Sequence, residues 1–281
     1  MPKADQWSDP ITIHGEGPIW NPLIQRFQLV DMLEGDVLTV DEGTVTDRTH
    51  VDTVAAIIRP RLYGGLVVAG ERDVILIDID GAQHRIEGSG VGIGSRFNEG
   101  ACAPDGSLWA GTMAYDAAAG AGVMVRLDPG TLSFTQVAAD LTISNGLAFE
   151  DTQSAYFVDS ASRSIDRLRI YSGEITGRSL WVDLANVEGV PDGICRDENG
   201  GVWVALYDGG AVHRYSAAGD LTDIVTVPVG QVTACALGGA DGRQLLITTS
   251  QLGHEGQVGA GGALFQISVD IPGTYYPLFG A

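Results

Sequence analysis

Lysine is nearly absent from this chain of 281 residues. Lys3 is the only one, so Schiff-base chemistry and Walker-type phosphate binding lose their usual reagent. Basic residues as a whole are few, because 16 Lys and Arg stand against 36 Asp and Glu, which gives a formal net charge of −20. Nucleic acids and acidic membranes are bound by clustered positive charge, so we expect neither of them as a partner.

Long apolar runs and cysteine motifs are missing too. No run approaches the roughly 18 apolar residues of a membrane-spanning helix. Residues 1–10 lack the apolar core of a signal peptide, so we expect a cytoplasmic protein. The three cysteines, Cys102, Cys195 and Cys235, have neither CxxC spacing nor the density of a disulfide framework. We interpret them as small apolar residues of the interior.

What the chain does contain is short runs rich in Val, Ile, Leu, Tyr and Trp, bounded by Gly, Asp and Asn. This pattern predicts an all-β protein, because no stretch of useful length has helical periodicity. Glycine tolerates positive φ, so four dipeptides are predicted to form hairpin turns. They are Asp80-Gly81, Asp105-Gly106, Asn199-Gly200 and Asp241-Gly242.

One template, a variable residue that glycine usually follows and then a short apolar strand, occurs six times. The variable positions are spaced 48, 35, 46, 47 and 42 residues apart, and a period of this size is typical of propeller blades. Six such units use nearly the whole chain. We therefore predict one six-bladed β-propeller domain over residues 1–281, rather than two β-sandwiches. The variable residues are Glu16, Gly64, Glu99, Asn145, Asp192 and Ala234.

These six positions should meet, because every blade presents the start of its innermost strand to the same end of the central channel. Three acids and an amide at one point would repel one another unless a positive ion lies among them. One divalent cation in the channel is the simplest such ion. Ca²⁺, Mg²⁺ and Mn²⁺ suit oxygen donors, and Zn²⁺ or Fe²⁺ also accept carboxylates. Taken singly, these dipeptides are ordinary turn formers, and only their shared register favours a metal site.

Five ordered segments resemble the signature stretches of the SMP-30/gluconolactonase/LRE family, which includes regucalcin and bacterial sugar lactonases. The resemblance implies that Glu16, Asn145 and Asp192 are the metal ligands and that Arg96 and Asn98 bind substrate oxygens. The segments are Gly15-Glu16-Gly17-Pro18-Ile19-Trp20, Arg96-Phe97-Asn98-Glu99-Gly100, Leu108-Trp109-Ala110-Gly111-Thr112-Met113, Ser144-Asn145-Gly146-Leu147-Ala148, and Pro191-Asp192-Gly193-Ile194-Cys195 with Leu206-Tyr207-Asp208-Gly209-Gly210.

The same resemblance bears on three further residues. In the family an acidic residue shortly after the Ala-Gly-Thr-Met stretch contacts the substrate, and counting forward reaches Asp116, where relatives often have Glu. Glu99, often Asp in relatives, is not expected to be a direct ligand despite its register. His14 lies two residues before Glu16 and could share its face of the strand, although the family motif does not require a His there.

The activity that the resemblance implies is metal-dependent hydrolysis of a small sugar lactone to the aldonic acid. In this hypothesis the cation polarises the lactone carbonyl, Arg96 and Asn98 fix the sugar hydroxyls, and Asp192 also orients or deprotonates the attacking water. Two alternatives stay open: an organophosphate hydrolase of the phosphotriesterase kind, and a non-catalytic metal-binding propeller. The sugar is not specified, because the discriminating loops, 59–63, 115–120 and 250–259, are the least patterned parts of the chain.

Overall fold

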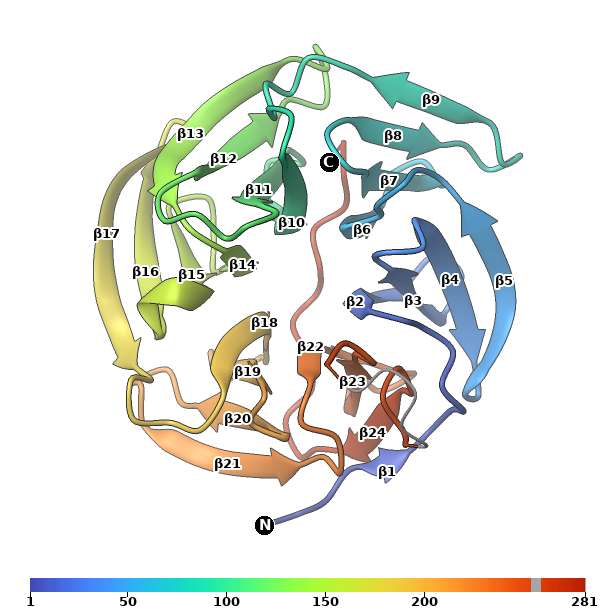
Figure 1. Ribbon diagram of the computed structural model, residues 1–281, viewed down its shortest axis with the longest axis vertical. Coiled ribbons are helices and arrows are strands. Elements are labelled where there is room, and N and C mark those ends of the chain that lie inside the picture. The colour runs from blue at the N-terminus through green and yellow to red at the C-terminus, as the bar shows by residue number, and fades with distance from the viewer. Residues whose placement is uncertain (254–258, 281) are drawn as a thin grey trace.

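The computed structural model of the chain describes residues 1–253 and 259–280. Within them, 24 strands form six four-stranded sheets that stand in a ring (Figure 1). The prediction of an all-β, six-bladed propeller is confirmed. The one helical segment in this described part is the 3-10 turn η1 (Ser160–Ser162), and no helix there is long and apolar enough to cross a membrane.

Each of the first five blades consists of four consecutive antiparallel strands, innermost first. Blade one holds β2 (Gly15–Asn21), β3 (Arg26–Asp31), β4 (Asp36–Asp41) and β5 (Thr44–His50). Blade two holds β6 (Ile57–Pro60), β7 (Leu66–Ala69), β8 (Val74–Ile77) and β9 (Gln83–Ile86). Blade three holds β10 (Ser95–Cys102), β11 (Leu108–Ala114), β12 (Gly122–Leu127) and β13 (Phe134–Leu141). Blade four holds β14 (Ser144–Phe149), β15 (Ser154–Asp159), β16 (Ser164–Tyr171) and β17 (Glu174–Asp183). Blade five holds β18 (Val190–Arg196), β19 (Val202–Tyr207), β20 (Ala211–Tyr215) and β21 (Leu221–Thr226).

The sixth blade joins the two ends of the chain. Its inner strands are β22 (Val232–Gly238), β23 (Gln244–Thr249) and β24 (Phe265–Ser268), and its outermost strand is the N-terminal β1 (Asp5–Gln6). Asp5 pairs with Gln266 and Gln6 with Phe265. Backbone hydrogen bonds therefore close the ring, and no inner strand is left without a partner on its outer side.

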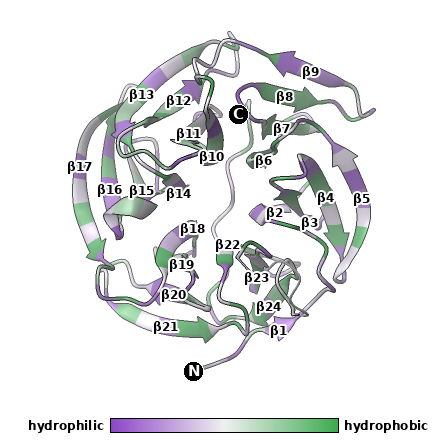
Figure 2. Cartoon of the chain, viewed as in Figure 1, coloured by the Kyte–Doolittle hydropathy of each residue, from purple (hydrophilic) through white to green (hydrophobic). Residues whose placement is uncertain are grey.

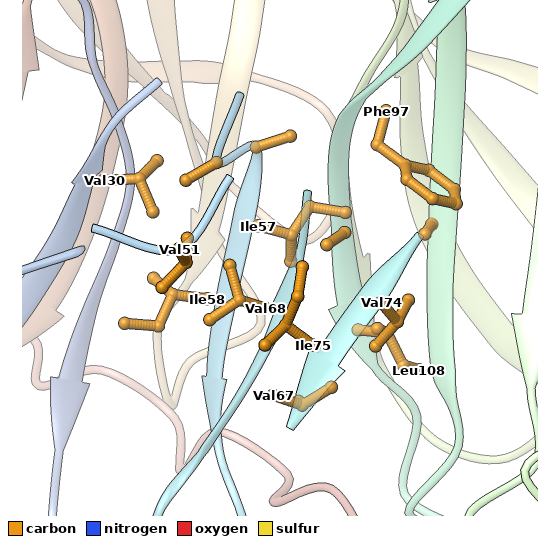
Figure 3. Packing of buried hydrophobic residues seen from close by; sticks show 14 of the residues in the cluster. Val30, Val51, Ile57, Ile58, Val67, Val68, Val74, Ile75, Phe97 and Leu108 are labelled. Atoms are coloured by element: carbon orange, nitrogen blue, oxygen red, sulfur yellow. The ribbon is translucent and has the colours of Figure 1, made fainter. Parts of the chain in front are cut away.

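Burial falls from the axis outward. All seven residues of β22 are buried, whereas none of β5 is. The outer strand β17 carries both hydrophilic and hydrophobic residues (Figure 2). Inner strands are covered on both faces by neighbouring blades, so they read as continuous apolar runs. Between blades one, two and three the packing is mostly of Val and Ile, with Phe97 and Leu108 from blade three (Figure 3). Each fully buried side chain of this size contributes about 1.5–3 kcal/mol.

The prediction for blade two was wrong at one position. Gly64 does not begin an innermost strand; it lies in the turn between β6 and β7, with a φ of 93°. The apolar run after Gly64 forms the second strand, and the unequal spacings of 48 and 35 residues around Gly64 reflect this shift. The residue beside the start of blade one is instead Ala56, whose carbonyl oxygen lies 3.4 Å from where a Cβ on Gly17 would stand.

Glycine next to the variable residue has a packing role in the channel wall. A Cβ on Gly146 would lie 2.7 Å from the carbonyl oxygen of Asp192, and one on Gly193 would lie 2.5 Å from the Cβ of Ala234. Adjacent innermost strands thus approach too closely for any side chain there. The strand registers also shift at these places, for example between Ser144 and Leu147, so a bulge redirects the residue before each glycine.

Candidate active site

Glu16, Asn145 and Asp192 begin the innermost strands of blades one, four and five, and all three are buried. Burial, then the charges of Asp192 and Glu99, raises the pKa of Glu16 well above its usual range. Burial, then the charge of Glu99, does the same to the pKa of Asp192. These mutual effects mean that the carboxyl groups lie close together, as the repeat register predicted.

Two oxygen atoms in this group have no partner. Asn145 Oδ1 and Asp192 Oδ1 are buried and accept no hydrogen bond within the described residues. An unpaired buried oxygen is costly, so an arrangement of this kind calls for a ligand. Two carboxylates and an amide oxygen are hard donors that fit a divalent cation. No group of three His, Cys, Asp or Glu side chains suited to a metal occurs in residues 1–253 and 259–280, so the candidate ligand set combines two carboxylates with the amide of Asn145.

Ser160, the first residue of η1, holds Asn145 in place. Asn145 Nδ2 donates to Ser160 Oγ at 3.0 Å, and Ser160 Oγ donates to the carbonyl oxygen of Pro191 at 2.7 Å. The amide nitrogen is thereby held in place, while the amide oxygen has no partner among the described residues. One hydroxyl group thus couples the strand of Asn145 to the strand of Asp192.

Glu99 shares the register of these residues but has partners of its own. Its carboxylate accepts a hydrogen bond from Gly100 N at 3.2 Å, and its Oε1 lies 3.5 Å from Nη2 of Arg59. Burial raises the pKa of Glu99, and Arg59 opposes that rise. Arg59 also donates to the carbonyl oxygens of Ile58 and Gly100, so it is fixed as a cation beside the carboxyl cluster.

Arg96 and Asn98 stand together on β10. Arg96 Nη1 donates to Asn98 Oδ1 at 2.6 Å and to the carbonyl oxygen of Phe97 at 3.0 Å, and Asn98 Nδ2 donates to the carbonyl oxygen of Ser144 at 2.9 Å. Burial lowers the pKa of Arg96, while the nearby charges of Tyr115, Glu16 and Asp192 oppose this. The two predicted substrate contacts therefore lie within electrostatic reach of the predicted metal ligands.

Asp116 lies outside this cluster. It is exposed in the turn after β11, and its Oδ1 accepts a hydrogen bond from Ala118 N at 3.1 Å. Within the described part of the chain, no hydrogen bond or ion pair joins Asp116 to Arg96 or Asn98. Its predicted contact with the substrate stays a prediction.

His14, which the sequence left undecided, lines the site. Its Nε2 lies 3.8 Å from Glu16 Oε1, and its Nδ1 is 2.8 Å from Ser250 Oγ. Burial, then the charge of Arg96, lowers the pKa of His14 to about 3, so the ring is neutral. Ser250 opens the loop 250–259 that was expected to discriminate the sugar, of which residues 254–258 lie outside the described residues; neither Ser250 nor the neighbouring Tyr207 was singled out as a site residue. Tyr207 lay in a recognised motif, but nothing in the sequence indicated which of its neighbours in space would matter.

Comparison with known sequences shows which protein family the chain belongs to. The sequence model of the SMP-30/gluconolactonase/LRE-like region matches residues 14–251. The chain belongs to this family. The match begins at His14 and ends one residue after Ser250, so it contains all the residues described above.

Similar members of the SMP-30/gluconolactonase/LRE-like family cover nearly all of the chain. The pentonolactonase XacC of Haloferax volcanii is 32% identical over 92% of each chain. The 6-deoxy-6-sulfogluconolactonase of Pseudomonas putida is 31% identical over 95% of each chain. The crystal structure of a calcium-binding protein, regucalcin, from Agrobacterium tumefaciens superposes with a TM-score of 0.91 at 26% identity, covering 100% of this chain and 99% of the other. Two of these relatives are thus named as lactonases, and the solved structure of a third shares the propeller fold of this chain.

Proposed function

We propose that this protein is a metal-dependent lactonase that opens a small sugar lactone to the aldonic acid. The observation that carries the proposal is the pair of unpartnered oxygens, Asn145 Oδ1 and Asp192 Oδ1, in the same channel as the Arg96–Asn98 pair. A non-catalytic metal-binding propeller would not need the Arg96–Asn98 pair. The names of the two lactonase relatives support the substrate class, and the calcium-binding regucalcin supports a divalent cation.

Glu16, Asn145 and Asp192 would hold one divalent cation, whether Ca²⁺, Mg²⁺, Mn²⁺, Zn²⁺ or Fe²⁺. When bound, such a cation supplies electrophilic stabilisation of the negative charge that develops on the carbonyl oxygen. Arg96 and Asn98 orient the lactone through its hydroxyl oxygens, which keeps the carbonyl carbon near the acids. The channel wall around them is buried, so these polar contacts act with little competition from solvent.

Asp192 has the second role of handling the proton. Its carboxylate orients the attacking water and accepts a proton from it. The hydroxyl oxygen joins the carbonyl carbon, the ring carbon–oxygen bond breaks, and the proton passes to the released ring oxygen. The product is the open hydroxy acid.

A pH-stat assay tests this proposal directly. We would follow acid release from a panel of aldonolactones, with and without added divalent cations, and include an organophosphate triester. The expected result is metal-dependent acid release from at least one lactone, and loss of that activity in Asp192→Asn. Glu174→Gln, which removes an exposed carboxylate on the outer strand β17, is the matched control. Full activity in Asp192→Asn would refute the site. Cleavage of the triester alone, or of nothing, would favour one of the two alternatives.

A further inference from the structure

A second polar wall faces Arg96 and Asn98 across the ring. It consists of His14 before β2, Ser250 after β23 and Tyr207 at the end of β19, which belong to blades one, six and five. Blade three, which carries Arg96, lies on the far side of the axis from blade six (Figure 1). We propose that this wall is a second hydroxyl-binding subsite for the lactone, with His14 Nε2 as the atom that touches the substrate. This inference rests on the proposed function.

The backbone fixes this wall. His14 and Ser250 pair in an antiparallel bridge, and Gln251 N donates to the carbonyl oxygen of Ile13 at 2.9 Å. Asp31, at the end of β3, accepts from the backbone N–H groups of both Ile13 and His14, at 2.9 and 3.0 Å. The imidazole therefore projects from a segment held on two sides, as a recognition group must.

Ser250 holds the Nδ1 side of the His14 ring. Leu252 N donates to Ser250 Oγ at 3.0 Å. The distance from Oγ to His14 Nδ1 is 2.8 Å, whereas that to the carbonyl oxygen of Ile13 is 3.4 Å. Ser250 therefore occupies Nδ1 in either tautomer of the ring, and Nε2 is the ring nitrogen left for a ligand.

Nε2 has no hydrogen-bond partner among the described residues. Glu16 Oε1, at 3.8 Å, is beyond hydrogen-bond distance, and no hydrogen bond from another described residue reaches Nε2. Tyr207 joins this wall through Ser250: burial, then the charges of Asp208 and Asp192, raises the pKa of the Tyr207 hydroxyl to about 12, and a hydrogen bond with Ser250 partly opposes this. A hydroxyl group can both donate and accept, so a sugar hydroxyl suits Nε2 in either tautomer of the ring.

With polar contacts from two opposite walls, the site would recognise a lactone by its hydroxyl groups. A lactone with several ring hydroxyls can satisfy Arg96–Asn98 and His14 together, and a bare ring can satisfy neither. A site built to hydrogen-bond a substrate hydroxyl disfavours an analogue that lacks it, because the polar groups of the site are then left unpaired. The protein should therefore prefer polyhydroxylated lactones to unsubstituted ones.

The test compares two lactones in three proteins: wild type, His14→Met, and His14→Gln, which keeps an N–H donor. The lactones are D-glucono-1,5-lactone and δ-valerolactone, which has the same ring without hydroxyls. We expect His14→Met to lower kcat/KM for the hydroxylated lactone about tenfold more than kcat/KM for δ-valerolactone, with most of this difference removed in His14→Gln. The affinity for Mn²⁺, measured by calorimetry, should be the same in all three.

Other outcomes would overturn the inference in distinguishable ways. An equal loss on both lactones, or weaker Mn²⁺ binding, would mean that His14 acts on the structure or the metal site rather than on the substrate. No loss on either lactone would mean that His14 does not touch the substrate, while the lactonase proposal stands. Wild-type protein that hydrolyses neither these nor any other lactone would refute the proposed function itself.

Discussion

The two ends of the central channel are formed by the same innermost strands, yet their polar groups differ in how they are satisfied. Five buried side-chain atoms in the described residues lack a hydrogen-bond partner. Four of them, on Ser144, Asn145, Asp192 and Gln231, lie where innermost strands begin, and only Arg196 Nε lies where one ends. Unpaired polar atoms are thus concentrated at the end that holds the candidate site.

At the other end the C-terminal segment crosses the channel (Figure 1). Thr274 N donates to the carbonyl oxygen of Arg196, and Phe279 N donates to that of Pro60, so the segment is anchored on two blades. Residues 274–277 cover a cavity of about 50 Å³, room for a few waters. The two ends of one repeat thus differ: most polar groups at the strand ends are hydrogen-bonded within the protein, whereas the unpaired atoms at the strand starts form the candidate site.

The largest effect should come from Arg59, which lines the cavity just below the acids. Replacing it in Arg59→Met leaves the buried carboxylate of Glu99 without its cation, so we expect a loss of about 3–5 kcal/mol in the free energy of unfolding. Urea unfolding measures it. The double variant Arg59→Met/Glu99→Gln should recover most of the loss. A loss below about 1 kcal/mol in the single variant would mean that Arg59 does not neutralise the cluster.

Replacing Ser160 should give the next largest effect, on cation binding at the channel end that holds the candidate site. Ser160→Ala removes the acceptor that orients Asn145, so we expect divalent cations to bind about 10–100-fold more weakly. Calorimetry with Mn²⁺ provides the measurement. Ser162→Ala is the matched control, because Ser162 lies in the same turn but bonds to the carbonyl oxygen of Asp159 instead. Equal affinity in the two variants would contradict the role of Ser160.

Much of the candidate site was predictable from the sequence, since the register across the repeat identified Glu16, Asn145 and Asp192. Single dipeptides could not have done so. Asp105-Gly106 forms a turn in which glycine has a φ of 81°, whereas the glycine of Asp192-Gly193 has no positive φ and allows a close approach between strands. The two pairs are identical in sequence. Only their place in the repeat separates a turn former from a candidate ligand.

Other parts of the site depend on contacts between distant segments. Ser160 follows Asn145 by 15 residues and touches Pro191, and Ser250 reaches His14 across 236 residues. No local pattern encodes such pairs, because ring closure brings them together. The register of blade two was missed for a different reason: Ala56, at the level of Glu16, is apolar and gives no signal, so the conspicuous glycine of the next turn was counted instead.

A substitution at Tyr276 tests the channel end that the C-terminal segment crosses, apart from the candidate site. Its hydroxyl oxygen accepts a hydrogen bond from Leu237 N at 3.1 Å, and Tyr276→Phe leaves that buried N–H unpaired. We expect a loss of about 1 kcal/mol in the free energy of unfolding and no change in kcat/KM or in cation affinity. Tyr275→Phe, at an exposed neighbour, should change none of these quantities. A fall in kcat/KM for Tyr276→Phe would show that the two ends are coupled, and the division between them would fail.

The smallest effect is expected from His213, which lies in β20, away from both ends of the channel. Burial lowers the pKa of His213 below its usual 6.5, so the folded protein keeps the ring neutral. As the pH falls through about 6.5, the unfolded chain binds a proton that the folded chain does not, and stability is lost toward acid. His213→Phe removes this contribution. Its Tm should therefore fall less than that of wild type between pH 7.5 and 5.5, and an equal fall in the two proteins would mean that the ring takes up its proton without unfolding the blade.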